Sequence, residues 1–196
     1  PGGAANVANN IRALEAKVCL LGAVGSDNNA KILLAELKKR KINTAGIFVE
    51  PQRHTTVKTR IISGHQQIAR LDWEHTHALP QELNSRIACF IEKNIKSFDA
   101  VIIEDYGKGV INTGLLDEII ALAHKYKKII TVDPKEENFQ YYRGVTAITP
   151  NRKELENAVR DLKIRDTTNA LKVHNHRLST DKDIDLAAGQ ILKYLG

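Results

Sequence analysis

Polar residues that can bind phosphate or sugar oxygens stand directly after three short apolar segments. They are Glu104, Asp105 and Lys108 after segment 100–103, Asp133 and Lys135 after segment 129–132, and Asn151 and Glu154 after segment 146–149. Each apolar segment has the length of a buried strand, and a helical pattern follows the first and the third of them. Because parallel strands end at one edge of a sheet, where ligands bind, these groups are expected to meet there. One group alone is weak evidence, since such loops are polar anyway, but three on one edge favour a site.

Two glycines, Gly2 and Gly3, stand directly before a helical pattern over residues 4–16. Glycine lets a ligand approach the backbone closely, and the free N–H groups at the start of a helix attract oxygen-rich ligands. A flexible terminus followed by an ordinary helix accounts for these residues equally well. Their spacing alone does not decide between the two interpretations.

A predicted insert at about residues 45–75 carries a concentration of positive charge. Its strand-like segments, 46–50, 55–63 and 66–74, follow one another without a helix, and a hairpin turn is expected at Ser63-Gly64. We therefore expect a three-stranded antiparallel lid. No acidic residue occurs from Pro51 to Leu71, whereas four cations do: Arg53, Lys58, Arg60 and Arg70. Such a lid suits an anionic substrate, although for any single cation an exposed charge that protects a strand edge is the simpler explanation.

Two His-x-His pairs and two cysteines are the remaining reactive side chains. They are His75 with His77, His174 with His176, and Cys19 and Cys89. A His-x-His pair on a strand can hold a metal, but without a third nearby ligand each pair is better explained as two surface histidines, and no structural metal is expected. Both cysteines lie in apolar segments, which favours buried thiols in a reducing compartment.

The composition is that of a globular protein. Of 196 residues, 42% are hydrophobic and 27% are charged, and 29 Lys and Arg against 23 Asp and Glu give a net charge of +6. This excess suits an anionic small ligand as well as a nucleic acid, but the basic cluster at 38–41 lacks interleaved aromatic residues and is better explained as a solvated helix end. No apolar run is long enough to span a bilayer, and no leader pattern is present. We therefore expect a cytoplasmic protein without a nucleic-acid or membrane partner.

Strand and helix patterns alternate outside the insert. Strands are expected at 18–24, 100–105, 129–132 and 146–149. Helices are expected at 4–16, from Ser26 and Asp27 to the basic cluster at 38–41, at 80–96, at 113–127, from 151 through 159, and at 183–194. Ser26 and Asp27 are expected to supply the cap of the helix that follows them, and Asn112 the cap of the helix from 113. Such alternation predicts an α/β fold, with a parallel sheet, helices on both faces and a small antiparallel β lid. Residues 163–180 have weak periodicity and are expected to form a loop or to be disordered.

Several segments occur in the order and form found in one known family. They are residues 1–8 (PGGAANVA), 55–60 (TTVKTR), 65–72 (HQQIARLD), 105–109 (DYGKG), 133–135 (DPK) and 149–154 (TPNRKE). Over residues 1 to about 156 the chain resembles the ribokinase-like carbohydrate kinases, and within them the branch that phosphorylates D-glycero-D-manno-heptose 7-phosphate. That branch is often fused to an ADP-heptose synthase domain and makes precursors of the lipopolysaccharide core. The resemblance implies transfer of the ATP γ-phosphate to the anomeric hydroxyl of the sugar phosphate.

The resemblance also assigns roles to individual residues. On the substrate side it places sugar-hydroxyl ligands at Gly2, Gly3 and Asn6, sugar-phosphate ligands at Lys58, Arg60 and Arg70, and further contacts at Asp105 and Lys108. On the nucleotide side it places Lys135, Asn151, Arg152, Lys153 and Glu154, with Glu154 ordering Mg²⁺ through water. ATP and Mg²⁺ are therefore the expected cofactors, and a homodimer through the lid is the expected assembly.

The family's general base is the Asp of a Gly-x-Gly-Asp motif, which does not occur among these 196 residues. No catalytic residue is therefore assigned, and residues 1–196 are interpreted as a single, incomplete kinase domain with little activity of its own. Two alternatives stay open: another sugar or nucleoside kinase of the same superfamily, and a non-catalytic binding or assembly module.

Overall fold

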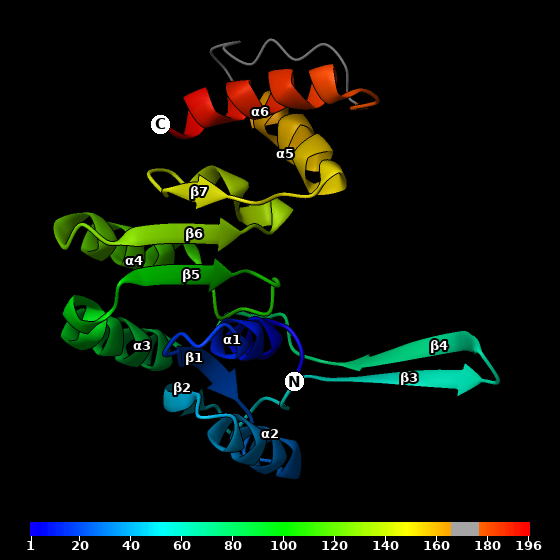
Figure 1. Ribbon diagram of the computed structural model, residues 1–196, viewed down its shortest axis with the longest axis vertical. Helices are drawn as coiled ribbons and strands as arrows, with labels where there is room; N and C mark the ends of the chain where they lie inside the picture. The colour runs from blue at the N-terminus through cyan, green and yellow to red at the C-terminus, as the bar shows by residue number, and fades with distance from the viewer. Residues whose placement is uncertain (166–176) are drawn as a thin grey trace. The chain divides into compact units, whose positions relative to one another are not determined.

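The computed structural model describes residues 1–165 and 177–196. It divides the chain into two compact units, the first made of residues 1–93 and 108–111, the second of residues 94–107 and 112–196. In chain order the helices and strands are α1 (Ala4–Ala13), β1 (Cys19–Val24), α2 (Asn28–Lys39), β2 (Asn43–Val49), β3 (Val57–Ser63), β4 (Gln66–Trp73), α3 (Gln81–Asn94), β5 (Ala100–Glu104), α4 (Thr113–Lys125), β6 (Ile129–Asp133), β7 (Ala147–Ile148), α5 (Arg152–Arg165) and α6 (Asp181–Leu195) (Figure 1).

The first unit is built on a β1–α2–β2 segment whose two strands pair in parallel. The predicted cap of α2 is confirmed, because Oδ1 of Asp27 accepts a 2.8 Å hydrogen bond from the N–H of Ala30. Small and aliphatic side chains from α1, α2 and the residue before β2 form a buried core cluster in this unit: Ala5, Ala8, Leu37 and Ile42. Val18, Leu20, Leu33 and Ile47 pack against that core.

The antiparallel insert has two strands, and the expectation of three is wrong. Segment 46–50 belongs to β2, which pairs in parallel with β1, because the preceding helix α2 carries the chain back to the start of a parallel neighbour. β3 and β4 form a separate two-stranded sheet. The two residues between them are Gly64 and His65, one position later than expected, and Gly64 has the positive φ of 58° that glycine adopts without strain.

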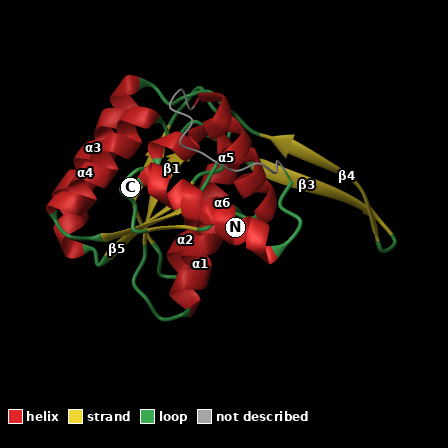
Figure 2. Cartoon of the chain, turned by 90° about the horizontal axis from the view of Figure 1, so that it is seen from above, coloured by secondary structure: helices red, strands yellow, loops and turns green. Residues whose placement is uncertain are grey.

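This β3–β4 hairpin has one charged face and one apolar face. Residues opposite each other in an antiparallel pair share a face, and the register places Lys58 opposite Asp72 and Arg60 opposite Arg70. The alternate pairs are Val57 with Trp73, Thr59 with Leu71, and Ile61 with Ala69. Figures 1 and 2 both show the hairpin extending away from the rest of the first unit, and Trp73 is 62% exposed.

The second unit contains a three-stranded parallel sheet in the order β5-β6-β7. Asn112 caps α4 as expected, with its Oδ1 accepting from the N–H of Leu115 at 3.1 Å. The largest fully buried side chains of the unit include Tyr142, Phe139 and Leu116. α5 extends to Arg165, beyond its expected end. The expected loop at 163–180 therefore begins as helix, while most of it, with His174 and His176, lies outside the described residues.

The α/β class is thus confirmed, with the parallel strands divided between two sheets, one in each unit. In the described part of the chain no helix is long and apolar enough to cross a membrane. The expectation of two buried thiols is wrong for Cys89, which is exposed. The buried side chains of α3 are Leu83, Ile87 and Ile91, a spacing that leaves residue 89 on another side of the helix. Cys19 is half-buried, and this burial raises the pKa of its thiol.

Candidate active site

The charged face of the hairpin is part of an ion-pair network that ends on Lys108. Nζ of Lys58 lies 2.8 Å from Oδ2 of Asp72 and 3.2 Å from Oε2 of Glu74, and Nε of Arg70 lies 2.9 Å from Oδ1 of Asp72. Nζ of Lys108 pairs with Oε1 of Glu74. The hydrogen bond from Lys108 holds the pKa of Glu74 below its usual value, and that from Lys58 does the same for Asp72. The positive charge of the acid-free stretch is therefore partly neutralised by Asp72 and Glu74, the two acids that follow it.

Arg60 is the cation that this network leaves without an acid. It is exposed, it forms no ion pair with any carboxylate that the structure describes, and it lies directly opposite Arg70. Like charges directly opposite each other destabilise a sheet. An anion bound on this face would relieve that repulsion, so the Arg60–Arg70 pair favours an anionic ligand.

Arg53 does not belong with the hairpin cations, contrary to expectation. It precedes β3 by four positions, and only 6% of the residue is exposed. Its guanidinium donates from Nη1 to the carbonyl oxygen of Lys108 at 3.0 Å and from Nη2 to that of His77 at 2.9 Å. Its charge is thus used inside the fold and is unavailable to a ligand in this conformation.

The predicted glycine segment leads directly into α1. Gly3 is the residue before the helix, with a positive φ of 54° that a larger residue would adopt only with strain, and no side chain caps this end. The N–H groups of Asn6 and Val7 turn back to the carbonyl oxygen of Gly3. Gly2, Gly3 and Asn6 are all exposed. The start of α1 therefore presents an open backbone beside an accessible amide side chain.

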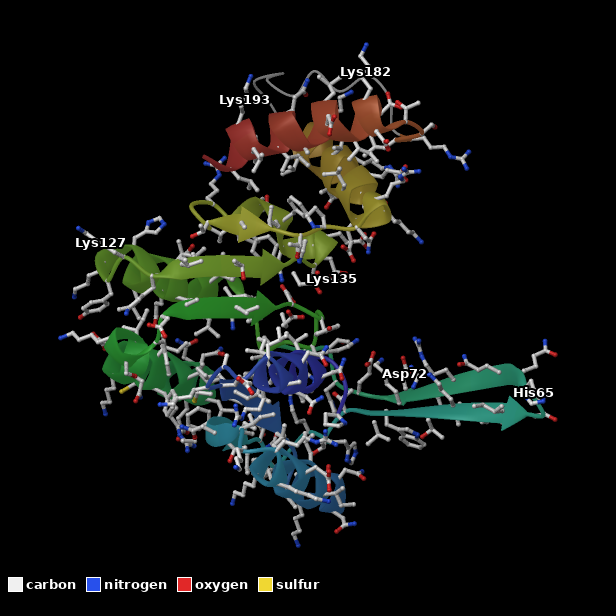
Figure 3. All side chains as sticks on the ribbon, in the orientation of Figure 1. His65, Asp72, Lys127, Lys135, Lys182 and Lys193 are labelled. Atoms are coloured by element: carbon white, nitrogen blue, oxygen red, sulfur yellow. The ribbon has the colours of Figure 1, made fainter. Side chains whose placement is uncertain are left out.

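In the second unit Glu104 and Asp105 lie beside Asp133 at the strand ends, whereas Lys108, which was predicted with them, belongs to the first unit. Glu104 is the register partner of Asp133, and the N–H of Asp105 donates to the carbonyl oxygen of Asp133 at 3.1 Å. Burial raises the pKa of Glu104, and the charge of Asp133 raises it further. Burial likewise raises the pKa of Asp133, and Glu154 adds to the effect. Figure 3 shows Lys135 at the carboxyl end of β6 and Lys127 at the opposite end.

Asp105 is held inside the second unit rather than left open. The residue is 5% exposed. Its Oδ2 accepts from the hydroxyl of Tyr142 and from Nδ2 of Asn138, both at 2.7 Å, and its Oδ1 accepts from the N–H of Gly107 at 2.8 Å. Such a satisfied carboxylate favours a role in positioning the loop after β5 over direct contact with a substrate.

The nucleotide-side residues surround the start of α5. The N–H of Asn151 donates to Oε2 of Glu154 at 2.8 Å, and the N–H of Glu154 donates to Oδ1 of Asn151 at 3.0 Å, so the two residues form a capping box. Arg152 and Lys153 in the first turn are exposed. The positive end of the helix dipole repels these two cations, whereas it would stabilise a phosphate bound at the same place. Nζ of Lys135 has no hydrogen-bond partner among the described residues.

A model of the "pfkB family carbohydrate kinase" matches residues 1–180 of this chain. The chain belongs to the pfkB family of carbohydrate kinases. It is 48% identical over 158 residues to the "Bifunctional protein HldE" of Helicobacter pylori (strain G27), a match that covers 81% of the chain and 34% of that protein. It is 38% identical over 179 residues to the protein of the same name from Geobacter metallireducens, covering 91% of the chain and 36% of the relative. The chain therefore spans about a third of the length of these curated relatives.

Solved structures show the same fold. Phosphofructokinase-2 from Escherichia coli, in its tetrameric inhibited form, superposes with a TM-score of 0.69 at 16% identity, covering 99% of this chain and 59% of that one. A carbohydrate kinase from Agrobacterium tumefaciens superposes with a TM-score of 0.66 at 13% identity, covering 98% and 56%. At these identities the likeness establishes the ribokinase-like fold of this pfkB-family chain and nothing about its substrate.

Sequence patterns do not indicate two residues that lie near the candidate sites of this pfkB-family chain. One is Tyr142, which is fully buried and supports Asp105, and whose hydroxyl also accepts from the N–H of Lys135 at 3.1 Å.

The other is His54, which provides a third imidazole beside the predicted His75–His77 pair. Its ring centroid lies 5.5 Å from that of His75, and the centroid of His75 lies 4.9 Å from that of His77. Desolvation, together with the charges of its histidine neighbours, lowers the pKa of His75. Within residues 1–165 and 177–196, however, no three His, Cys, Asp or Glu side chains are arranged to hold a metal ion.

Proposed function

We propose that this chain is the sugar-phosphate kinase part of a bifunctional protein like its HldE relatives. The reaction is transfer of the γ-phosphoryl group of ATP to the anomeric hydroxyl of D-glycero-D-manno-heptose 7-phosphate. Identities of 38–48% to HldE proteins and the motifs at 55–60 and 65–72 support this choice of substrate. The observation that carries it is the Arg60–Arg70 pair, because two opposed cations suit a sugar that already bears a phosphate.

On the substrate side, the open start of α1 binds sugar hydroxyls and the charged face of the hairpin binds the 7-phosphate. Gly2, Gly3 and Asn6 are exposed and supply backbone and amide groups. Arg60 and Arg70, with Lys58 and Lys108, put four cations against the two carboxylates of Asp72 and Glu74. The remaining positive charge attracts the sugar phosphate, and the network orients the cations before the ligand arrives.

On the nucleotide side, the residues present fit the phosphates of ATP. The open ammonium of Lys135 and the first turn of α5, with Arg152 and Lys153, provide positive charge, and Asn151 and Glu154 shape that turn. Carbohydrate kinases of the pfkB family use ATP, typically with a divalent metal. Mg²⁺, when bound, neutralises charge on the transferring phosphoryl group. Glu154 would help to order Mg²⁺ through water when the ion is bound together with the nucleotide phosphates.

No residue of this chain is proposed as the general base. Asp105 has partners on both carboxylate oxygens, and Asp133 lies beside two other acids. The Gly-x-Gly-Asp motif of the family supplies a base and helix N–H groups together, and that motif does not occur among these 196 residues. The 196-residue chain therefore binds ligands but turns over ATP slowly.

The apolar face of the hairpin is proposed to pair with a second copy of the chain. It carries Trp73, Leu71 and Ile61, which are between 44% and 62% exposed. A two-stranded sheet is marginally stable alone and gains stability when such a face is covered.

The location is proposed to be the cytoplasm, whose reducing conditions suit the two free cysteines of the chain.

Calorimetric titration tests the substrate assignment. Heptose 7-phosphate is expected to bind the chain, whereas the same heptose without its phosphate binds at least tenfold more weakly. Selective binding of adenosine or of an unphosphorylated ketose would instead favour another kinase of the superfamily. Self-association without binding of any sugar or ATP would favour an assembly module.

A further inference from the structure

Arg53 joins three segments of the first unit that are distant in the sequence. Its Nη1 bonds to Lys108 and its Nη2 to His77, so one guanidinium holds the loop after β5 and the segment after β4. Arg53 itself lies in the segment that leads into β3. Both ends of the hairpin and the Lys108 loop therefore meet at this one side chain.

The charge of Arg53 is balanced in an unusual way. The side chain is buried, and none of the carboxylates that the structure describes forms an ion pair with it. The acid that acts on it electrostatically is Glu50, from a distance too long for an ion pair. Two backbone carbonyl dipoles are its direct partners. Burying a cation on carbonyl groups alone is costly, which favours a specific positioning role for the Arg53 side chain.

The backbone around Arg53 is tightly fitted on both sides. A Cβ on Gly109 would clash with the carbonyl group of His77, and the N–H of Leu79 donates to the carbonyl oxygen of Gly109 at 3.0 Å. On the other side, a Cβ on Gly25 would lie 2.3 Å from the carbonyl oxygen of Arg53. These close approaches leave the segments around Arg53 little freedom to shift.

The segment between Arg53 and β3 is also fixed. Oδ2 of Asp27 accepts from the N–H of Thr55 at 2.7 Å, and the N–H of Gly25 donates to Oγ1 of Thr55 at 3.0 Å. The hairpin thus starts from a rigid root, and the side chain of Arg53 links this root to both other segments.

We propose that Arg53 is a positioning residue that holds the hairpin cations and Lys108 in a fixed arrangement, so that all of them act on one anionic ligand. The inference rests on the proposed function for the nature of that ligand. Arg53 holds the backbone of Lys108, while the side chain of Lys108 reaches Glu74 at the end of the hairpin. Loss of the guanidinium frees the carbonyl oxygen of Lys108, so that the half-buried ion pair of Lys108 with Glu74 and the neighbouring Leu79–Gly109 hydrogen bond must hold the register without it.

Arginine is required at this position for a geometric reason. Its planar fork directs two donors at two separate carbonyl groups, whereas a lysine ammonium is a point charge on a flexible stem. Arg53→Lys keeps the charge but not the fork, and Arg53→Gln keeps one amide donor without charge. Arg40→Lys is the matched control, because Arg40 is an exposed arginine of the same unit whose ion pair is with Glu36 on α2.

The test has a ligand-free arm and a ligand arm, both on the 196-residue chain. Without ligand, hydrogen exchange in peptides covering 58–74 and 77–79 is expected to accelerate at least tenfold in Arg53→Lys, with the cooperative thermal transition retained. With ligand, binding of heptose 7-phosphate is expected to weaken at least tenfold while binding of unphosphorylated heptose changes less than twofold. A merely structural role would weaken both sugars alike. Arg40→Lys is expected to match the parent chain in both arms.

A second comparison tests whether Arg53 acts through Lys108. In the background of Lys108→Met, the further change Arg53→Lys is expected to weaken sugar-phosphate binding less than twofold. Full additivity of the two changes, or parent-like exchange and binding in Arg53→Lys and Arg53→Gln, would overturn the proposal. If the parent chain binds no sugar phosphate, the proposed function fails, while the ligand-free arm still decides whether Arg53 sets the hairpin.

Discussion

The hydroxyl of Tyr142 donates a 2.7 Å hydrogen bond to Oδ2 of Asp105, and both residues are buried. The pair ties the segment after β6 to the end of β5, where the DYGKG segment begins. Its burial and the neighbouring carboxylate strongly raise the pKa of Tyr142, so the phenol keeps its proton and stays a donor. Asp105 is thereby held as a structural acceptor.

Tyr142→Phe is expected to destabilise the protein by about 1–3 kcal/mol, because it removes a donor from a buried carboxylate. Chemical denaturation measures the change in the free energy of unfolding. Tyr141→Phe is the control next in sequence, since Tyr141 is not fully buried, and it is expected to stay within about 0.5 kcal/mol of the parent. Equal stabilities for the two variants would show that the buried hydrogen bond is not important.

Arg60→Gln is expected to change stability and binding in opposite directions. Removing one of two opposed cations stabilises the ligand-free hairpin by roughly 0.2–1 kcal/mol. The same change weakens binding of the sugar phosphate, and added salt then weakens binding less than in the parent chain. Titrations at two salt concentrations measure both effects, with Lys31→Gln on the exposed surface of α2 as a control. Unchanged affinity in Arg60→Gln would remove the main support for a phosphorylated substrate.

The acids at the strand ends predict a pH dependence of stability. Burial and mutual repulsion raise the pKa of Glu104 and Asp133, so the folded state binds their protons more tightly than the unfolded state does. Their contribution to stability is therefore present at low pH and is lost as the pH rises from the ordinary carboxyl range through the raised pKa values.

Asp133→Asn is consequently expected to raise the Tm at pH 7 by about 2 °C, the shift that roughly 0.5–1 kcal/mol produces in a protein of this size. At pH 4 the gain is expected to be smaller, because the raised pKa of Asp133 leaves more of this carboxyl group protonated in the folded parent at pH 4 than at pH 7. Calorimetric melting curves at both pH values measure this. A larger gain at pH 4 than at pH 7 would contradict the sign.

The apolar face of the hairpin predicts self-association. Trp73→Ser is expected to shift the chain from dimer to monomer at tens of micromolar, by rough analogy with ordinary dimer affinities. Light scattering gives the mass. Leu14→Ser is the control, because Leu14 is 82% exposed but lies after α1, outside the hairpin. A monomeric parent chain at this concentration would refute the proposed dimer.

Local signals in the sequence predicted the elements well, whereas pairings across the chain were harder to predict. The caps at Asp27 and Asn112 depend on residues three positions away, and both are confirmed. Segment 46–50 was correctly expected to be a strand, but its partner is β1, on the far side of a helix. Strand composition does not specify the partner, so the strand was assigned to the wrong sheet.

Side-chain burial explains the remaining differences at the candidate site. Arg53 precedes the hairpin cations in the sequence and shares their charge, yet its side chain turns inward to two carbonyl groups. Asp105 has the position of a ligand-binding acid at a strand end, but Tyr142 and Asn138, 37 and 33 residues away, occupy its carboxylate. No short-range pattern in the sequence predicts hydrogen-bond partners that are so distant along the chain.

The most direct test of the account measures ATP consumption with heptose 7-phosphate and Mg²⁺. It compares the 196-residue chain with a longer form of the protein that also carries the family's Gly-x-Gly-Asp motif. The longer form is expected to turn over ATP with the 7-phosphate and not with unphosphorylated heptose. The 196-residue chain is expected to be at least a hundredfold slower, since loss of a single electrostatic donor commonly costs about that much. Equal, substantial turnover by both forms would show that the base lies within this chain, with Asp105 the first residue to test, and no turnover by the longer form would contradict the proposed reaction.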